Sequence, residues 1–154
     1  MTDLDRLFNP RTVVVVGGKE AQRVMEQCDR FGFEGSIWPV NPTRAEMRGR
    51  LCYPSIESLP GVPDAAYVAV NRERSVDIIA RLAAIGCGGA ISYAAGFAEI
   101  EHSAGSSNAK GGALQQQLVA AAGSMPLLGP NCYGFINTLS RVTLWPDQHG
   151  ARPC

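Results

Sequence analysis

The sequence has no long apolar run and no excess of either charge, and these absences exclude several classes of protein. Its hydrophobic segments are too short to span a bilayer, and its acidic N-terminus lacks the cationic and apolar parts of a signal peptide. Fourteen basic residues balance fourteen acidic ones, giving a formal net charge of +0. No overall field therefore attracts nucleic acid or an anionic membrane. We expect a cytoplasmic protein that binds neither.

Paired cysteines are also missing. The five cysteines are widely spaced, with no C-x-x-C and no pairing with the two histidines. An odd number of thiols in a chain without a signal peptide favours reduced cysteines over disulfides, and this spacing disfavours a zinc site. We therefore predict no metal site.

What is present is a composition of 45% hydrophobic and 18% charged residues over 154 positions, which is that of one ordinary globular domain. Near its start, four valines in a row, Val13 to Val16, predict a strand that is buried on both faces. Gly17 and Gly18 follow, and residues 20–31 have the apolar spacing of a helix. A glycine turn that leads into a helix N-terminus favours an anion, most often a phosphate.

The rest of the chain repeats this alternation of strand and helix. It predicts an α/β fold, a Rossmann-like doubly wound domain with a mainly parallel sheet of five to six strands. We assign residues 1–142 to this single domain and residues 143–154 to the start of a linker to a following domain. The predicted strands cover residues 13–16, 36–40, 65–70, 90–93 and 126–128, and the predicted helices cover 20–31, 75–85 and 114–122.

Segments rich in Gly, Asn and Pro follow each predicted strand, where ligands bind in such sheets. The common ligand NAD is disfavoured, because the turn at Gly17-Gly18 has no third glycine of the dinucleotide fingerprint. In addition, the second strand ends in Asn41-Pro42, with no carboxylate to hold the ribose.

Five motifs occur in register along the chain: Leu7-Phe8-Asn9-Pro10-Arg11-Thr12-Val13, Val40-Asn41-Pro42, Cys52-Tyr53-Pro54-Ser55, Ala95-Gly96-Phe97 and Leu128-Gly129-Pro130-Asn131-Cys132-Tyr133-Gly134-Phe135-Ile136-Asn137. Together they resemble the N-terminal CoA-binding domain of NDP-forming (ADP-forming) acyl-CoA synthetases, which are related to the succinyl-CoA synthetase alpha subunit. The resemblance extends from Leu7 to about Asn137.

This resemblance implies that the chain binds coenzyme A or an acyl-CoA, and it implies a role for each loop. The implied contacts are Gly17 and Gly18 with the phosphates; Asn41, Pro42 and Arg44 with the nucleotide end; Val70 and Asn71 with the adenine or the pantetheine entrance; Ala95, Gly96 and Phe97 with the pantetheine arm; and the loop from Gly129 to Gly134, including Asn131 and Cys132, with the thiol end.

Two segments depart from the family pattern. Lys19 stands where relatives carry a small hydroxyl residue, so it is either a phosphate ligand or a solvated lysine. The segment Arg72-Glu73-Arg74 is strongly polar, and we interpret it as the solvated first turn of a helix.

Two residues near the expected thiol end have alternative roles. Cys132 is either a nucleophile or a structural thiol that lines the cleft, and we favour the structural role. The Asn131 amide either caps its own turn or donates to a ligand.

No residue of this chain is predicted to be catalytic. In the family, a phosphohistidine and an ATP-grasp domain do the chemistry, so ATP and ADP would act only through other domains; His102 and His149 do not match the phosphohistidine position. The expected partners are a CoA ligand, the remaining synthetase domains or subunit, and a possible second copy of the chain. The alternatives are a regulatory CoA- or nucleotide-sensing module, as in acetyltransferase fusions, and an NAD(P)-binding oxidoreductase domain.

Overall fold

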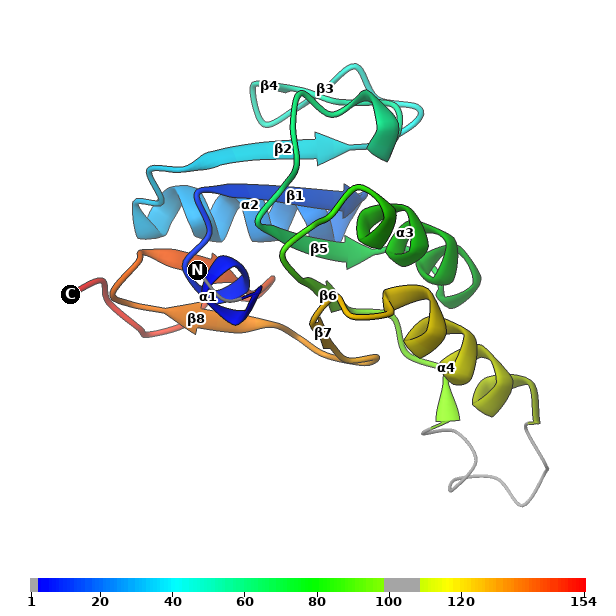
Figure 1. Ribbon diagram of the computed structural model, residues 1–154. Coiled ribbons are helices and arrows are strands. Elements are labelled where there is room, and N and C mark those ends of the chain that lie inside the picture. The colour runs from blue at the N-terminus through cyan, green and yellow to red at the C-terminus, as the bar shows by residue number, and fades with distance from the viewer. Residues whose placement is uncertain (1–2, 99–108) are drawn as a thin grey trace.

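A five-stranded parallel sheet forms the centre of the computed structural model, which describes residues 3–98 and 109–154 (Figure 1). The strand order is β2-β1-β5-β6-β7, and all pairings within this sheet are parallel. The predicted α/β doubly wound fold is therefore confirmed. The strands are β1 (Thr12–Gly17), β2 (Ser36–Val40), β5 (Ala65–Ala69), β6 (Ala90–Ser92) and β7 (Leu127–Leu128).

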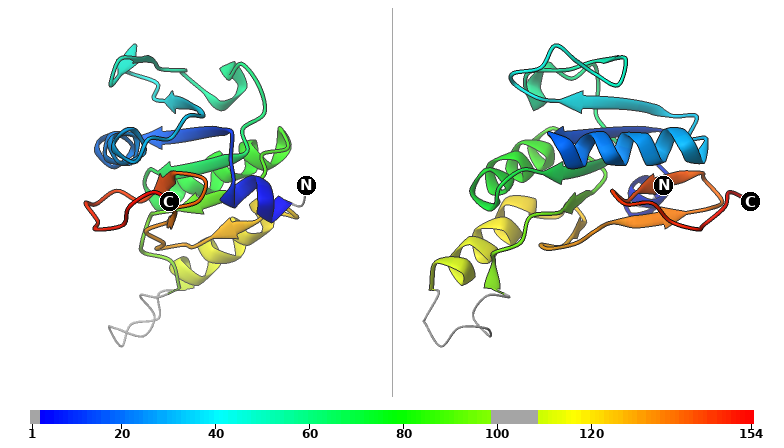
Figure 2. Two further views of the ribbon diagram at one scale, coloured as in Figure 1. Left: turned by 90° about the vertical axis from the view of Figure 1, so that its left-hand side faces the viewer. Right: turned by 180° about the vertical axis from the view of Figure 1, so that it is seen from behind.

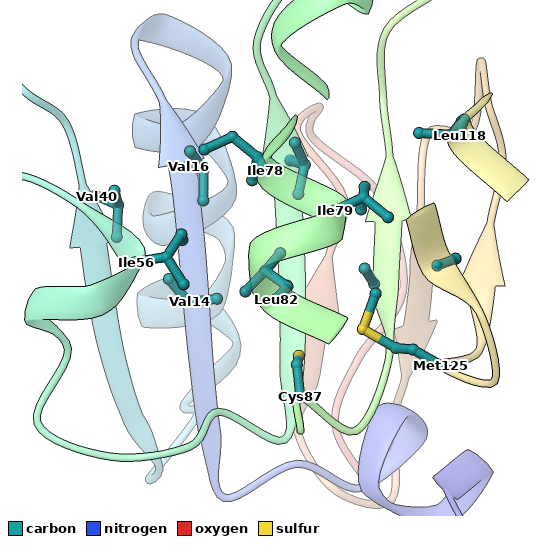
Figure 3. Packing of buried hydrophobic residues seen from close by; sticks show 14 of the residues in the cluster. Val14, Val16, Val40, Ile56, Ile78, Ile79, Leu82, Cys87, Leu118 and Met125 are labelled. Atoms are coloured by element: carbon teal, nitrogen blue, oxygen red, sulfur yellow. The ribbon is translucent and has the colours of Figure 1, made fainter. Parts of the chain in front are cut away.

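Helices cover both faces of the sheet, with α2 (Lys19–Phe31) on one face and α3 (Arg72–Ala84) and α4 (Ala109–Ala122) on the other (Figure 2). The valine run explains this arrangement, because successive strand side chains point to opposite faces. Val13 and Val15 pack with the apolar face of α2, whereas Val14 and Val16 pack under α3 and α4. Figure 3 shows Val14 and Val16 among Ile78, Ile79 and Leu82 of α3 and other members of that second core.

Two helices begin before their apolar spacing does. Helix α3 starts at Arg72, ahead of the spacing that begins at residue 75, so Arg72-Glu73-Arg74 is its first turn, as interpreted from the sequence. The Asn71 side chain accepts a hydrogen bond from the Arg74 main-chain N–H and caps this turn. Helix α4 starts at Ala109, five residues before the predicted start at residue 114. Residues 99–108, with His102, lie outside the described residues.

A short N-terminal helix, α1 (Asp3–Phe8), was not predicted, and one aspartate connects it to the sheet. The Asp64 carboxylate accepts hydrogen bonds from the main-chain N–H groups of Arg11 and Thr12 and pairs with Arg6 at 3.2 Å. Partial burial acts to raise the pKa of Asp64, but these hydrogen bonds outweigh it and hold the pKa below its usual value.

An antiparallel hairpin, β8 (Phe135–Asn137) with β9 (Val142–Leu144), was also not predicted. All three residues of β9 are buried, and the strand packs against α2. In this contact the Cys28 Sγ donates to the Thr143 carbonyl oxygen at 3.2 Å. The predicted boundary between residues 142 and 143 falls inside this strand. Thr143 and Leu144 are both fully buried, and Leu144 packs in the core under α2.

The two edges of the sheet are short or covered. Beside β2, a bridge pairs Val40 with Tyr53, and the Tyr53 N–H donates to the Pro39 carbonyl oxygen at 2.9 Å. Tyr53 belongs to the connection from β2 to β5. This connection also contains the small hairpin β3 (Glu46–Met47) with β4 (Arg50–Leu51) and the 3-10 turn Ile56–Ser58. The opposite edge strand, β7, has two residues. Among the described helices, none is long and apolar enough to cross a membrane.

Candidate functional site

The chain passes from β1 outward to β2 and then crosses back to β5 on the other side of β1. In an open parallel sheet this reversal leaves a crevice beyond the carboxyl ends of the strands. A cavity of about 200 Å³ lies there. Its lining comes from the ends of three strands and the segments that follow them: Val16, Gly17, Gly18, Val40, Asn41, Pro42, Ala69, Val70, Asn71 and Arg74.

The two glycines at the floor of this cavity have different surroundings. Gly17 has a φ of +139°, and a Cβ at this position would overlap the Ala69 carbonyl oxygen of the neighbouring strand. A Cβ added at Gly18 would meet no atom within 4 Å. Gly17 thus allows β1 to approach β5 closely, whereas Gly18 leaves open space above the backbone.

Helix α2 begins directly beside this space, at Lys19. Gly18 is its N-cap, and no side chain of the described residues forms a capping hydrogen bond there. The N-terminal turn of a helix carries main-chain N–H groups without intrahelical acceptors and a partial positive charge. The cavity therefore has the electrostatics of an anion site.

Asn41 joins the loop after β2 to the turn after β1. Its Nδ2 donates to the Gly17 carbonyl oxygen at 2.9 Å, and its Oδ1 accepts from the main-chain N–H groups of Thr43 and Arg44 at 3.0 and 3.2 Å. The sequence places Asn41 correctly at the cavity. The structure shows that its amide holds two walls together, which motif spacing alone does not reveal.

The third wall is the start of α3. Val70 and Asn71 line the cavity as their position after β5 predicts, and the Asn71 side chain is used as the helix cap. Arg74 also lines the cavity, and it is exposed in the first turn of α3, as the interpretation of this segment as a solvated turn predicts. Its place five residues after the end of β5, in the first turn of the next helix, is the signal that identifies it.

The other predicted contacts are not part of this cavity's lining. Lys19 and Arg44 are exposed and do not line it. Gly96, in the loop after β6, accepts a hydrogen bond from the Arg72 guanidinium, so this loop is connected to the first turn of α3. The Phe97 side chain is completely buried in the core under α3 and α4. It therefore faces the core.

The loop from Gly129 to Gly134 is bound to the end of β6. The Asn131 N–H donates to the Ala94 carbonyl oxygen at 2.9 Å, and the Cys132 N–H donates to the Ser92 carbonyl oxygen at 3.1 Å. A Cβ at Gly134 would overlap the Leu144 carbonyl oxygen, so this glycine allows close packing on β9. Ala95 and Asn131 are exposed at this carboxyl edge, and Cys132 is half-buried.

Three aromatic rings lie beside this loop. The ring centroid of Tyr133 lies 5.6 Å from that of Tyr93 and 5.1 Å from that of Trp145. The Tyr67 hydroxyl donates to the Tyr133 carbonyl oxygen at 3.1 Å, and burial raises the pKa of Tyr67 above its usual value. These contacts fix the loop at the same edge of the sheet as the cavity.

Comparison with protein families decides what kind of domain this is. The profile of the family described as "CoA binding domain" matches residues 11–138. The chain belongs to the CoA binding domain family. The resemblance drawn from the five motifs is thereby confirmed. The matched region contains the cavity, the loop from Gly129 to Gly134 and strand β8.

Curated relatives of this CoA binding domain are larger proteins. A trans-feruloyl-CoA synthase from an unknown prokaryotic organism is 35% identical over 146 residues, which cover 92% of this chain and 20% of that protein. The ADP-forming acetate–CoA ligase II of Archaeoglobus fulgidus is 32% identical over 88% of this chain and 20% of that ligase. The chain thus spans about a fifth of the length of these two relatives.

A solved structure has the same arrangement. The dinucleotide-forming acetyl-coenzyme A synthetase 1 of Ca. Korarchaeum cryptofilum, in complex with phosphate and ADP, superposes with a TM-score of 0.82 at 30% identity. The match covers 94% of this chain and 31% of that one. The fold of this CoA binding domain is therefore that of one part of an acyl-CoA synthetase.

The side chains of the site are suited to binding an anion. Within residues 3–98 and 109–154, no group of three or more His, Cys, Asp or Glu side chains is arranged to hold a metal ion. The cavity lining contains no acid, histidine or cysteine. The arrangement has main-chain N–H groups at the start of α2 and one guanidinium, which are groups suited to an anion, while the two amides of the lining form hydrogen bonds within the protein.

Proposed function

We propose that this domain binds CoA or an acyl-CoA, with the diphosphate over Gly18 and the first turn of α2. The observation that carries the proposal is the open cavity at the switch point between β1 and β5, with the uncapped helix N-terminus beside it. Pantetheine would then extend past the end of β6 toward the loop from Gly129 to Gly134. The half-buried Cys132 lies in that loop and would border the thiol end.

Within a complete protein, the domain would supply the CoA site of an ADP-forming acid–CoA ligase. Its relatives include ADP-forming acetate–CoA ligases, among them an alpha subunit from Pyrococcus furiosus, of which the match covers 29%. In this proposal the chain binds CoA and directs the thiol, and it does not catalyse alone. Phosphoryl transfer and the binding of ATP and ADP belong to further domains or a partner subunit, to which the segment after β9 would lead.

Titration of thermal stability with ligands tests this proposal. A ligand that binds only the folded state stabilises it by about 2.7 kcal/mol at a hundred times its Kd. CoA and acetyl-CoA should raise the melting temperature, whereas NAD and NADP should not, because no carboxylate follows β2 to hold a ribose diol. A shift with NAD and none with either CoA species would contradict the proposal.

The variant Gly18→Val locates the site. Because a side chain at Gly18 enters open space, the variant should fold, and its valine should occupy the volume needed by the diphosphate. CoA should then cause no shift in melting temperature. Gly150→Val is the matched control, since Gly150 also has no atom within 4 Å of an added Cβ and lies outside the cavity lining. Unchanged CoA binding by a folded Gly18→Val variant would show that this turn is not the site.

A further inference from the structure

The inference here rests on the proposed function and concerns the side chain that recognises the phosphates. We propose that Arg74 pairs with the diphosphate of bound CoA and is the main side-chain ligand of that group. From the sequence, Lys19 is either a phosphate ligand or a solvated lysine, and the resemblance implies Arg44 at the nucleotide end of CoA. The structure leaves both of these outside the cavity lining and includes Arg74 in it.

The chemistry of the lining leaves this role to one residue. Most of the ten lining residues are aliphatic or glycine, and the polar ones are Asn41, Asn71 and Arg74. The Asn41 amide is bound to Gly17 and to the loop after β2, and the Asn71 oxygen caps α3. Arg74 is the one ionisable side chain in this lining.

The ion pairs around α3 also leave Arg74 available. Its neighbour Glu73 accepts from Arg72 at 3.1 Å and lies 3.9 Å from Lys110, so this carboxylate is shared by two other cations. Arg81, further along the same helix, pairs with Asp77 at 3.0 Å. Among the residues that the structure describes, no carboxylate forms an ion pair with Arg74.

The position of Arg74 complements the main-chain part of the site. Helix α2 begins beside Gly18, and α3 begins at Arg72, so the N-terminal turns of both helices border the same cavity. Arg74, exposed in the first turn of α3, and Gly18, the N-cap of α2, both line this cavity. Arginine binds phosphate oxygens through two parallel N–H donors, which a lysine cannot do. The diphosphate would thus be held from both sides.

The substitution Arg74→Gln tests this inference by calorimetric titration. The glutamine keeps the main-chain N–H that Asn71 caps, so helix α3 should remain intact. Arg30→Gln is the control, because Arg30 is exposed in the last turn of α2, outside the cavity lining. The two ligands are CoA and dephospho-CoA, which keeps the diphosphate and lacks the 3′-phosphate of the ribose.

We expect Arg74→Gln to lower the affinity for both ligands by about tenfold or more, because a charge-assisted hydrogen bond is lost. The decrease in affinity with added salt should also become shallower, because a screened charge pair is gone. Arg74→Lys should restore part of the affinity, and Arg30→Gln should bind as the unaltered chain does.

Each other outcome contradicts the inference in a different way. Loss of CoA affinity with unchanged dephospho-CoA affinity would assign Arg74 to the 3′-phosphate. Unchanged affinity for both ligands would remove Arg74 from the site while the proposed function stands. If the unaltered chain binds neither ligand, the proposed function and this inference are both wrong.

Discussion

Gly17 and Gly18 are adjacent in the chain, but glycine is required at Gly17 by close packing and strain, whereas Gly18 borders open space. At Gly17 the φ of +139° and the nearby Ala69 carbonyl oxygen both disfavour any side chain. We expect Gly17→Ala to lower the free energy of unfolding by about 2 kcal/mol or more, because the strain and the overlap act at the centre of the sheet. Urea unfolding followed by circular dichroism measures this, with Gly150→Ala as a control that should change stability little. Equal stability of the two variants would contradict this account of Gly17.

Single residues also show what the sequence pattern reveals about the site. The glycine pair and Asn41 were predicted at the cavity because backbone freedom and strand ends leave a clear pattern. Arg74 was assigned to a solvated turn and is exposed, but its place beside the cavity was missed, because a charged residue in a helix's first turn has the same sequence pattern whether or not a crevice lies next to it. Phe97 was expected beside a ligand, but a loop motif does not show which way its side chain turns, and this one completes the core.

Among the elements, the hairpin of β8 and β9 is part of the core rather than a connection. Leu144 is fully buried in the cluster around α2, whereas Leu139, between the two strands, is 80% exposed. Leu144→Ala should lower the free energy of unfolding by about 2–5 kcal/mol, the range for a cavity left by a buried leucine. Leu139→Ala should change it by less than about 0.5 kcal/mol. Chemical denaturation of both variants checks this pair, and equal effects would show that β9 does not support the domain.

The central strands were predictable because runs of β-branched and small apolar residues are typical of a buried parallel sheet. Strands β8 and β9 have three residues each, which is too short for a clear sequence pattern. The apolar residues of β9 pack against α2, which is far away in sequence, so local sequence does not predict their burial. The helix starts were placed too late because apolar spacing begins inside a helix, whereas caps and polar first turns extend it toward the N-terminus.

On the scale of the whole molecule, the reactivity of the cysteine thiols measures how well the two hydrophobic cores are shielded from solvent. Burial raises the pKa of Cys28 to about 12 and that of Cys87 to about 11, and Cys52 is buried as well. Because the thiolate is the reactive form, these three should resist alkylation in the folded protein. Cys132 is half-buried and Cys154 is exposed.

We therefore expect iodoacetamide at pH 8 to label Cys154 and Cys132 in the native protein, and the other three only after unfolding. Mass spectrometry of peptides from samples with and without urea distinguishes the two groups. Rapid native labelling of Cys28 would contradict the packing of β9 on α2, since its Sγ donates to the Thr143 carbonyl oxygen.

The margins of the central sheet have a consequence for solubility. A strand with free main-chain groups along its side is a template on which other chains pair and aggregate. Here the outer side of β2 carries Pro39, whose nitrogen has no proton to donate, and is partly occupied by Tyr53, while β7 presents two residues. Polymerisation by adding strands is therefore disfavoured on both sides, and attachment to neighbouring polypeptides is better accommodated by helices and loops.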